Sequence, residues 1–396
     1  MSRETKERVA GIFNELADAI ETGDFGTRPR IGLTVPGSEH GPEELVKAGE
    51  MAVEKYSDLD LVLIGDEIET DLETKAASDM EEAHEVMDEM LENGEIDGAV
   101  TLHYNFPLGV STVGRVVTPG CGKEMLISTT TGTSATDRVA SMVKNAVYGI
   151  ATARALGQKN PSLGILNIEG ARMVEKHLNT LSDNGYDINF AESARSDGGV
   201  VMRGNDLLLG TPDIMVTDTL TGNMLMKMFS AFTTGGAYEA TGYGYGPGIG
   251  EDYDKLICII SRASGAPVIA NAVKFAAMAA SGSVLDKVSE EMIKAKKAGL
   301  DDILDEIKSS KKEGSAKEKD EIEAPPTKTT GEEIPGVDIL NIDEAKNSLW
   351  AEGIYAETGM GCTGPVVLVN EEDLEKAREI LCDNGYISGE GEGGTC

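Results

Sequence analysis

The chain has 396 residues, 40% of them hydrophobic and only 5% aromatic, so its length and composition predict more than one lobe and an aliphatic core. Its 69 acidic and 35 basic residues give a formal net charge of -34, which argues against nucleic acid or an anionic membrane surface as a partner. A phosphate ligand stays compatible with this charge, because at roughly physiological salt charges beyond about 8 Å are screened, whereas hydrogen bonds act locally.

The N-terminal segment is polar and then amphipathic, without the apolar core of a signal peptide, and no apolar run reaches the ~18 residues of a membrane span. The cysteines form no C-x-x-C pair and have no histidine at a zinc-ligand spacing, so neither a metal site nor a disulfide framework is expected. We therefore expect a cytoplasmic protein with reduced thiols, no membrane partner and no cofactor. The five cysteines are Cys121, Cys258, Cys362, Cys382 and Cys396.

Short β-branched runs alternate with helical stretches, and this pattern predicts an α/β fold with a doubly wound, mainly parallel sheet in two lobes. The chain divides into a main region, 1–308, a charged flexible linker or insertion, 309–336, and a C-terminal βα unit, 337–396. The expected strands are Ile31–Val35, Leu61–Ile64, Ala99–Leu102, Met125–Ser128, Leu163–Ile168, Ile188–Phe190, Ile214–Thr217, Leu256–Ile260 and Val366–Val369.

Loops that leave the carboxyl ends of parallel strands meet along one sheet edge, so side chains distant in sequence converge there. His103 follows the third expected strand and is the histidine best placed to act as a base at this edge, although a structural histidine is the plainer interpretation. Cys121 has a glycine on each side and Lys123 two residues later, which makes it a candidate second thiol. Cys258 lies within an apolar run and is expected in the core.

The segment Ser128–Asp137 is expected to be a loop between a strand and the helix around Arg138–Ala155. Hydroxyls and backbone amides at a helix N-terminus form an anion site, so this loop is a candidate for phosphate binding. The alternative is a run of helix-capping residues with no ligand. The candidate phosphate-binding residues here are Ser128, Thr129, Thr130, Thr131, Gly132 and Thr133.

A second candidate phosphate loop, Thr217–Asn223, joins the strand at Ile214 to a helix that carries Lys227. Either Thr221 or Asn223 is expected to cap this helix, and Gly222 permits close backbone approach. Lys227 lies one turn beyond Asn223 on the same helix face. We therefore add Thr221, Gly222, Asn223 and Lys227 to the phosphate-binding candidates.

The segment Gly235–Gly250 contains seven glycines and three tyrosines. So many glycines give the backbone more freedom than regular structure allows, so we expect a flexible stretch. Its tyrosines make it a candidate lid over a ligand, and a plain flexible connection is the alternative.

The segment Glu357–Pro365 places one thiol, Cys362, among three glycines just before an apolar strand. Its glycines match G-x-G-x-x-G, but a dinucleotide site needs a helix after this motif, and here a strand follows. A glycine turn instead exposes backbone N–H groups that stabilise a thiolate or a thioester oxygen, unless the thiol is buried and inert. The predicted catalytic residues are Gly361, Cys362, Thr363 and Gly364.

The segments Pro161–Ile168 and Pro212–Lys227 resemble phosphate acyltransferases that make acyl phosphate for phospholipid synthesis. That family has a fold related to isopropylmalate dehydrogenases and phosphotransacetylases. The chain departs from it at Ile31–Gly41, which replaces an Asp-Ala-Met-Gly-Gly-Asp signature, and in its cysteine-bearing C-terminal unit. With Ile127–Arg138 and Glu357–Val369, these departures resemble the alpha subunits of component C of glycine/sarcosine/betaine reductase complexes, and the likeness spans nearly the whole chain.

The resemblance implies a subunit in which an acetyl group, delivered by the selenoprotein component A and held as a thioester on Cys362, is released to inorganic phosphate as acetyl phosphate. It also implies a component C beta subunit as partner, and we expect an oligomer. Two alternatives stay open: direct transfer from a thioester substrate with Cys362 only structural, and a non-catalytic scaffold for a beta subunit that carries the thioester. An isopropylmalate dehydrogenase-type oxidoreductase lacks support, because the chain has neither a nicotinamide signature nor a metal-binding carboxylate trio.

Overall fold

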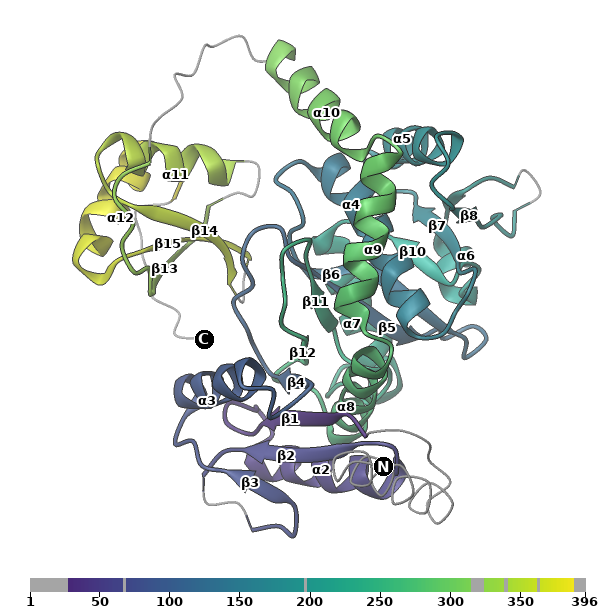
Figure 1. Ribbon diagram of the computed structural model, residues 1–396, viewed down its shortest axis with the longest axis vertical. Coiled ribbons are helices and arrows are strands. Elements are labelled where there is room, and N and C mark those ends of the chain that lie inside the picture. The colour runs from purple at the N-terminus through teal and green to yellow at the C-terminus, as the bar shows by residue number, and fades with distance from the viewer. Residues whose placement is uncertain are drawn as a thin grey trace, which may run out of the picture.

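The computed structural model of the chain describes residues 28–66, 69–195, 198–314, 324–337, 341–361 and 364–387 (Figure 1). Its main body is one twisted 12-stranded sheet with the order β3-β2-β1-β4-β12-β11-β5-β6-β10-β7-β8, and β9 also pairs with β7. The strands are β1 Arg30–Thr34, β2 Asp60–Ile64, β3 Glu73–Lys75, β4 Gly98–Thr101, β5 Ser111–Val117, β6 Glu124–Gly132, β7 Ser162–Leu166, β8 Asn189–Phe190, β9 Val201–Met202, β10 Ile214–Val216, β11 Gly246–Ile249 and β12 Ile257–Ile259.

Pairing within this sheet is parallel except where β11 meets β12 and β5, and where β5 meets β6. Helices cover both faces, so the central strands are buried on both sides and have largely apolar sequences, whereas the edge strand β3 is polar and exposed. The predicted doubly wound, mainly parallel fold is confirmed by this strand order and pairing. The helices of the main body are α2 Pro42–Lys55, α3 Met80–Glu92, α4 Arg138–Ala155, α5 Ala171–Asp183, α6 Gly204–Leu209, α7 Thr219–Ala231, α8 Ala266–Ser281, α9 Val284–Lys297 and α10 Leu300–Gly314, with a 3₁₀ turn η1 Phe232–Thr234.

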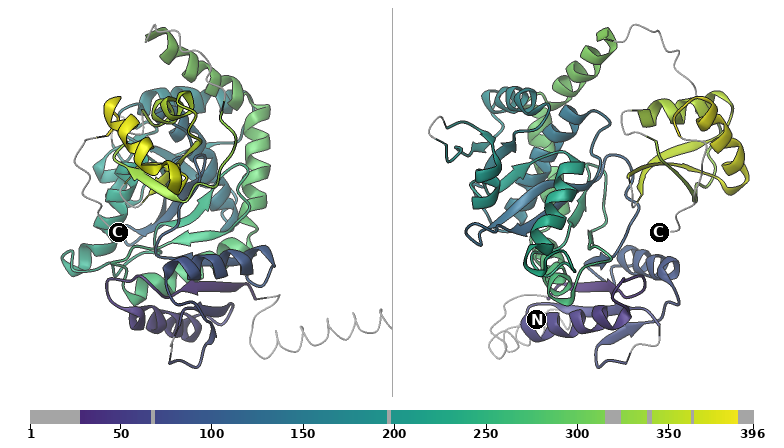
Figure 2. Two further views of the ribbon diagram at one scale, coloured as in Figure 1. Left: turned by 90° about the vertical axis from the view of Figure 1, so that its left-hand side faces the viewer. Right: turned by 180° about the vertical axis from the view of Figure 1, so that it is seen from behind.

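Three apolar clusters hold the main body together. One joins α2 and α8 to β1, β2, β4 and β12, a second joins α4, α5 and α9 to β7 and β10, and a third lies under α3, α6 and α7. Figures 1 and 2 show the resulting two lobes, with α2, α3 and β1–β3 in one and α4, α5, β6, β7 and β10 in the other. Across the described residues no single helix is long and apolar enough to cross a membrane, and α8 with α9 meets the length and composition only as a pair bent by 58°.

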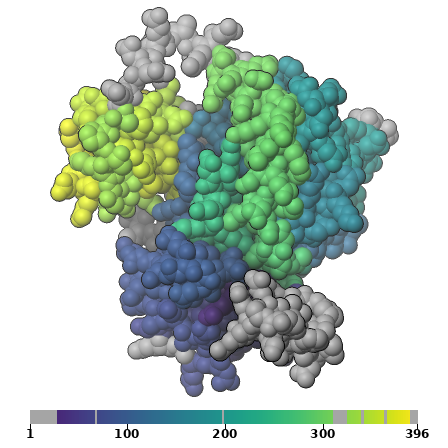
Figure 3. Space-filling model, viewed as in Figure 1, coloured from purple at the N-terminus to yellow at the C-terminus, as the bar shows by residue number. Residues whose placement is uncertain are grey.

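The C-terminal unit is more elaborate than the expected βα element. It has a three-stranded antiparallel sheet in the order β13-β15-β14, two helices and an apolar core of its own, centred on residues such as Leu349, Val367 and Leu381. In Figure 3 it forms a separate mass beside the main body. The elements are β13 Glu332–Pro335, α11 Ile342–Ala351, β14 Ala356–Gly361, β15 Gly364–Val369, η3 Glu371–Asp373 and α12 Leu374–Asp383.

The bounds of the predicted linker, 309–336, also change. Helix α10 continues to Gly314, and β13 begins at Glu332. Strand β13 could not be predicted from the sequence, because only Ile334 of its four residues has an apolar side chain in the core. Its pairing partner β15 lies more than 30 residues away.

The glycine–tyrosine segment Gly235–Gly250 is not a lid, since its last part is strand β11 in the middle of the sheet. Glycine serves close packing there: a β-carbon at position 246 would lie 1.9 Å from the carbonyl oxygen of Val113, and one at position 248 would lie 2.3 Å from the ring of Phe106. The expectation of a flexible stretch was wrong because composition does not distinguish glycines that permit motion from glycines that permit contact.

Gly222 sets how closely α7 approaches β6, and its replacement is a test of the packing. A β-carbon at position 222 would lie 1.7 Å from the carbonyl oxygen of Thr129, which is backbone and cannot move aside. We expect Gly222→Ala to lower the free energy of unfolding by at least ~2 kcal/mol, although alanine is the better helix former by ~1 kcal/mol. Urea denaturation of both proteins measures this.

The matched control is Gly204→Ala at the start of α6, where a β-carbon meets nothing within 4 Å and φ is not positive. That variant should keep the wild-type unfolding free energy to within about 0.5 kcal/mol. Equal midpoints for the two variants would contradict the packing shown at Gly222.

Candidate functional site

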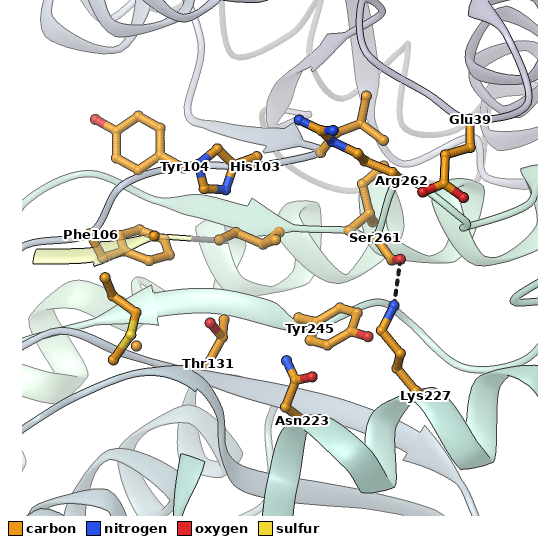
Figure 4. Close-up of a pocket in the computed structure, with 16 residues that line it drawn as sticks. Glu39, His103, Tyr104, Phe106, Thr131, Asn223, Lys227, Tyr245, Ser261 and Arg262 are labelled. Carbon is orange, nitrogen blue, oxygen red and sulfur yellow. Dashed lines mark hydrogen bonds between the residues drawn. The ribbon is translucent and has the colours of Figure 1, made fainter. Parts of the chain in front are cut away.

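A cavity of about 220 Å³ opens where the carboxyl ends of β4, β6 and β12 meet α7 and the C-terminal unit (Figure 4). This is the edge at which an open α/β sheet gathers its ligand-binding loops. The cavity is lined by Glu39, Leu102, His103, Tyr104, Phe106, Thr131, Gly132, Asn223, Lys227, Tyr245, Ile259, Ile260, Ser261, Arg262, Met360 and Gly361.

Two basic side chains face this cavity. Lys227 donates from Nζ to Ser261 Oγ at 3.2 Å and lies 3.7 Å from Oε1 of Glu239. Nε of Arg262 is buried and has no hydrogen-bond partner among the described residues. Figure 4 shows Arg262 near His103 and Glu39 on one side of the cavity, and Lys227 with Asn223 on the other. A buried guanidinium N–H without a partner is costly, so an anion bound here would stabilise it.

Lys227 is held by a buried carboxylate. Glu239 is 3% exposed, accepts a hydrogen bond from Ser264 Oγ at 2.8 Å and one from Tyr245 Oη at 3.3 Å. Tyr245 in turn forms part of the cavity wall. The tyrosine segment therefore contributes Tyr245 to the wall of the site.

Helix α7 supplies Asn223 and Lys227 from one side of its surface. Its N-cap is Asp218, whose carboxylate accepts from the backbone N–H of Thr221 at 2.8 Å and from the Thr221 hydroxyl at 3.1 Å. The predicted cap at Thr221 or Asn223 was therefore wrong, because aspartate at the first turn takes the free amides. Thr221 and Gly222 lie outside the cavity lining, whereas Asn223 donates from Nδ2 to the carbonyl of Thr130 at 3.2 Å and remains in it.

The predicted loop at Ser128 begins later than expected, since β6 continues to Gly132. The hydroxyls of Ser128, Thr129 and Thr130 are fully buried and donate to the carbonyls of Asn145, Thr112 and Tyr245. These three candidates, and the buried Thr133, do not line the cavity. Thr131 and Gly132 do line it, as the last residues of the strand.

His103 lies in the loop that leaves β4 and lines the cavity. Burial lowers the pKa of its imidazole, and the Arg262 guanidinium lowers it further, while the Glu333 carboxylate and a hydrogen bond with the Asn105 side chain oppose this shift. Net, the pKa is below the ordinary 6.5, so His103 is neutral at pH 7 and able to accept a proton.

The C-terminal unit reaches the same cavity through the end of β14. Met360 and Gly361 line the cavity, Gly361 pairs with Gly364, and Gly359 bridges to Pro107 of the main body. The side chain of Asn105 also donates to Glu333 of β13. The predicted catalytic residues Cys362 and Thr363 lie outside the described residues, and each is bonded to a glycine of this strand pair.

The sequence predicted a turn over Glu357–Pro365. In the structure, strand β14 includes residues 357–361 of this segment and β15 begins at Gly364. Glycine is a poor strand former, and pairing with β15 outweighs that local preference.

Cys121 lies elsewhere. It is exposed in the turn between β5 and β6, at the start of β6, whereas the cavity is at the end of that nine-residue strand, roughly 25 Å away at ~3.3 Å per residue. Cys258 is fully buried in β12, as expected, and burial raises the pKa of its thiol. The structure does not bring Cys121 to the other predicted residues.

Ser261, Arg262 and Glu239 are site residues that sequence reasoning missed. Ser261 and Arg262 directly follow the predicted strand Leu256–Ile260, so the same rule that selected the other strand-end loops applied to them. Glu239 had no such signal, because it lies in a segment whose glycine content predicted flexibility.

Comparison with known proteins places this site in context. The chain matches the family described as fatty acid synthesis protein over residues 29–368. It is 54% identical to a glycine/sarcosine/betaine reductase complex component C subunit alpha from Peptoclostridium acidaminophilum, over 97% of this chain and 99% of the relative. It is 26% identical to a phosphate acyltransferase from Staphylococcus haemolyticus, over 50% of this chain and 70% of that protein. A crystal structure of a branched-chain phosphotransacylase from Enterococcus faecalis matches 63% of this chain and 99% of that chain, with 15% identity and a TM-score of 0.47.

Proposed function

The chain belongs to the fatty acid synthesis protein family and, within it, to the alpha subunits of component C of glycine/sarcosine/betaine reductase complexes, and from this we propose that it transfers an acyl group from a thioester to inorganic phosphate. The cavity at the carboxyl edge of the sheet supports this proposal. Its cations and hydrogen-bond donors suit a phosphate, and its rim includes the residue next to Cys362.

The observation that supports phosphate as the acceptor is the pairing of Lys227 and Arg262 across one small cavity in a chain of net charge -34. Lys227 lies 3.7 Å from the Glu239 carboxylate and Glu39 also lines the cavity, so the donor that lacks a partner among the described residues is Nε of Arg262, and a bound anion would satisfy it. Asn223 and the hydroxyls of Thr131 and Ser261 add polar groups at the same cavity. We infer that phosphate binds between Lys227 and Arg262, with Arg262 Nε–H as one donor.

In the proposed reaction Cys362 carries the acyl group as a thioester. An oxygen of hydrogen phosphate attacks the thioester carbon, the carbon–sulfur bond breaks, and the acyl phosphate leaves while the phosphate proton passes to the sulfur. His103, neutral at pH 7, is the proposed carrier of that proton. Backbone N–H groups of the glycine-flanked segment are proposed to stabilise the oxyanion that forms during attack.

We further propose acetyl as the acyl group and acetyl phosphate as the product, with the selenoprotein component A as acyl donor and the component C beta subunit as partner. The support for these finer assignments is the 54% identity to an alpha subunit whose name places it in such a complex. No cofactor takes part in the proposed step, and inorganic phosphate is a substrate.

The test is exchange of labelled phosphate into acetyl phosphate by the isolated chain, with no added thiol. An acyl-enzyme predicts exchange under these conditions, because acetyl phosphate acylates Cys362 and labelled phosphate then removes the acetyl group. Because His103 must be neutral to accept a proton, the exchange rate should rise with pH through an apparent pKa below 6.5. Rates over pH 5–8 measure this.

His103→Gln is the control. Its exchange rate should no longer rise through the pKa of His103, but should keep the pH dependence that the ionisation of phosphate itself imparts near neutrality. Exchange that appears only when a free thiol is supplied would favour direct transfer without a covalent cysteine. No exchange under either condition, from a folded chain, would favour the scaffold alternative.

A further inference from the structure

The cavity at the carboxyl edge of the sheet has two chemically different ends. Figure 4 shows Lys227 and Ser261 at one end and the rings of Tyr104 and Phe106 at the other. Phosphate is proposed above to bind at the cationic end. The aromatic end is then the space left for the alkyl part of an acyl group, because apolar surface is removed from water there.

The C-terminal unit meets the main body at this aromatic end. Gly359 of β14 bridges to Pro107, the residue after Phe106, and Gly361 lines the cavity. Because Cys362 is bonded to Gly361, the strand pair that carries Cys362 approaches the cavity from this side. An acyl group on that sulfur, with its carbonyl carbon turned toward phosphate, then has its alkyl end among the aromatic rings.

The ring of Phe106 is packed on several sides, and its side chain is only 2% exposed. It lies edge-on to the ring of Tyr253, with centroids 5.6 Å apart and planes at 88°, and its centroid is 5.3 Å from that of Tyr104. Strand β11 packs directly against it, since a β-carbon at position 248 would lie 2.3 Å from the ring. The Tyr104 hydroxyl is in turn anchored by donating to the Asp88 carboxylate at 3.1 Å. A side chain packed in this way resists displacement by a ligand.

The size of the cavity leaves little room beyond a phosphate. Its two ends together enclose about 220 Å³, below the ~300–1,000 Å³ of pockets that hold drug-sized ligands. We infer that the ring of Phe106 closes the acyl end of the site and sets the length of the acyl group, so that acetyl is accepted and chains of butyryl length or longer are excluded. This assignment rests on the proposed function and adds to it the side chain that determines specificity for short acyl groups.

The test is exchange of labelled phosphate into acetyl, butyryl and hexanoyl phosphate by the full chain, compared as kcat/KM. The wild type should prefer acetyl phosphate to butyryl phosphate by roughly 10-fold or more, because methylenes that do not fit a pocket carry such a penalty. Phe106→Ala removes the ring and should raise the ratio of butyryl to acetyl kcat/KM roughly 10-fold or more. The KM for phosphate should stay at its wild-type value, since the cationic end is unaltered.

Phe106→Leu keeps more of the apolar volume, so it is less destabilised than the alanine variant and should shift the ratio less, in the same direction. Its matched control is Phe275→Leu, the same change at a fully buried phenylalanine of α8 outside the cavity lining, which should leave the ratio unchanged. Circular dichroism melts establish that each variant is folded. Equal exchange of all three acyl phosphates by the wild type, or the wild-type ratio in both folded Phe106 variants, would overturn the assignment of Phe106 while the proposed function stands. No exchange with any acyl phosphate would overturn both.

Discussion

Replacing Cys362 with serine is expected to abolish phosphate exchange into acetyl phosphate, by on the order of 10³-fold or more, because a serine hydroxyl is far less ionised than a thiol and forms no thioester. The unfolding transition should stay where it is, because serine and cysteine side chains are close in size. Labelled-phosphate exchange and a thermal melt on the same preparation measure the two properties.

Two other cysteines serve as controls for this variant. Cys121→Ser alters an exposed thiol at the far end of β6, and Cys382→Ser alters one on α12, so both should keep wild-type exchange. Acid quench during turnover, followed by peptide mapping, should find the acetyl group on the peptide that contains Cys362. Full exchange by the serine variant, or acetylation confined to Cys121, would remove Cys362 from the mechanism.

Replacing Arg262 with methionine is expected to raise the KM for phosphate roughly 10- to 100-fold, which corresponds to one lost charge-assisted hydrogen bond of about 1.5–3 kcal/mol. The same variant should be at least as stable as the wild type, because Nε of Arg262 is buried without a partner among the described residues. A residue that binds the ligand at a cost in stability is expected to give a higher KM together with an unchanged or higher free energy of unfolding when it is replaced. Initial rates against phosphate concentration and urea denaturation test the two halves separately.

Arg262→Lys keeps the charge but loses the planar guanidinium donors, so its KM for phosphate should lie between those of the wild type and Arg262→Met. Arg172→Met, on an exposed arginine of α5, is the control for loss of a positive charge. It should leave the KM for phosphate unchanged and the free energy of unfolding within about 0.5 kcal/mol of wild type. If Arg262→Met unfolded more easily and bound phosphate normally, Arg262 would be a structural residue.

Local pattern was enough to predict most of the strands. The eight expected strands of the main region all appear, seven of them within two residues at either end, and β6 extends four residues beyond its predicted end, since each is an apolar run flanked by helical periodicity. The rule that strand ends converge also predicted that His103, Thr131, Gly132, Asn223 and Lys227 would lie at one edge, and all five line one cavity.

Other features depended on contacts between distant residues. Whether Gly246 permits motion or close packing depends on Val113, more than 130 residues away, and β13 is a strand because β15 lies beside it. Likewise, the sequence predicted the hydroxyls of Ser128, Thr129 and Thr130 as ligand donors. In the structure they donate instead to the backbone carbonyls of Asn145, Thr112 and Tyr245. The local sequence does not show which distant residues will be the packing or hydrogen-bond partners.

The sequence by itself therefore determined the fold class and the edge at which a site forms, because apolar periodicity and chain direction are local properties of the polypeptide. Only the tertiary structure decided which candidates face the cavity, that Arg262 belongs to it, that a buried Glu239 holds Lys227, and that the C-terminal unit contributes Gly361. The physical reason is that a polar group acts on a ligand only if no neighbour in the fold has already taken its hydrogen bonds, and that is settled by packing between segments far apart in the chain.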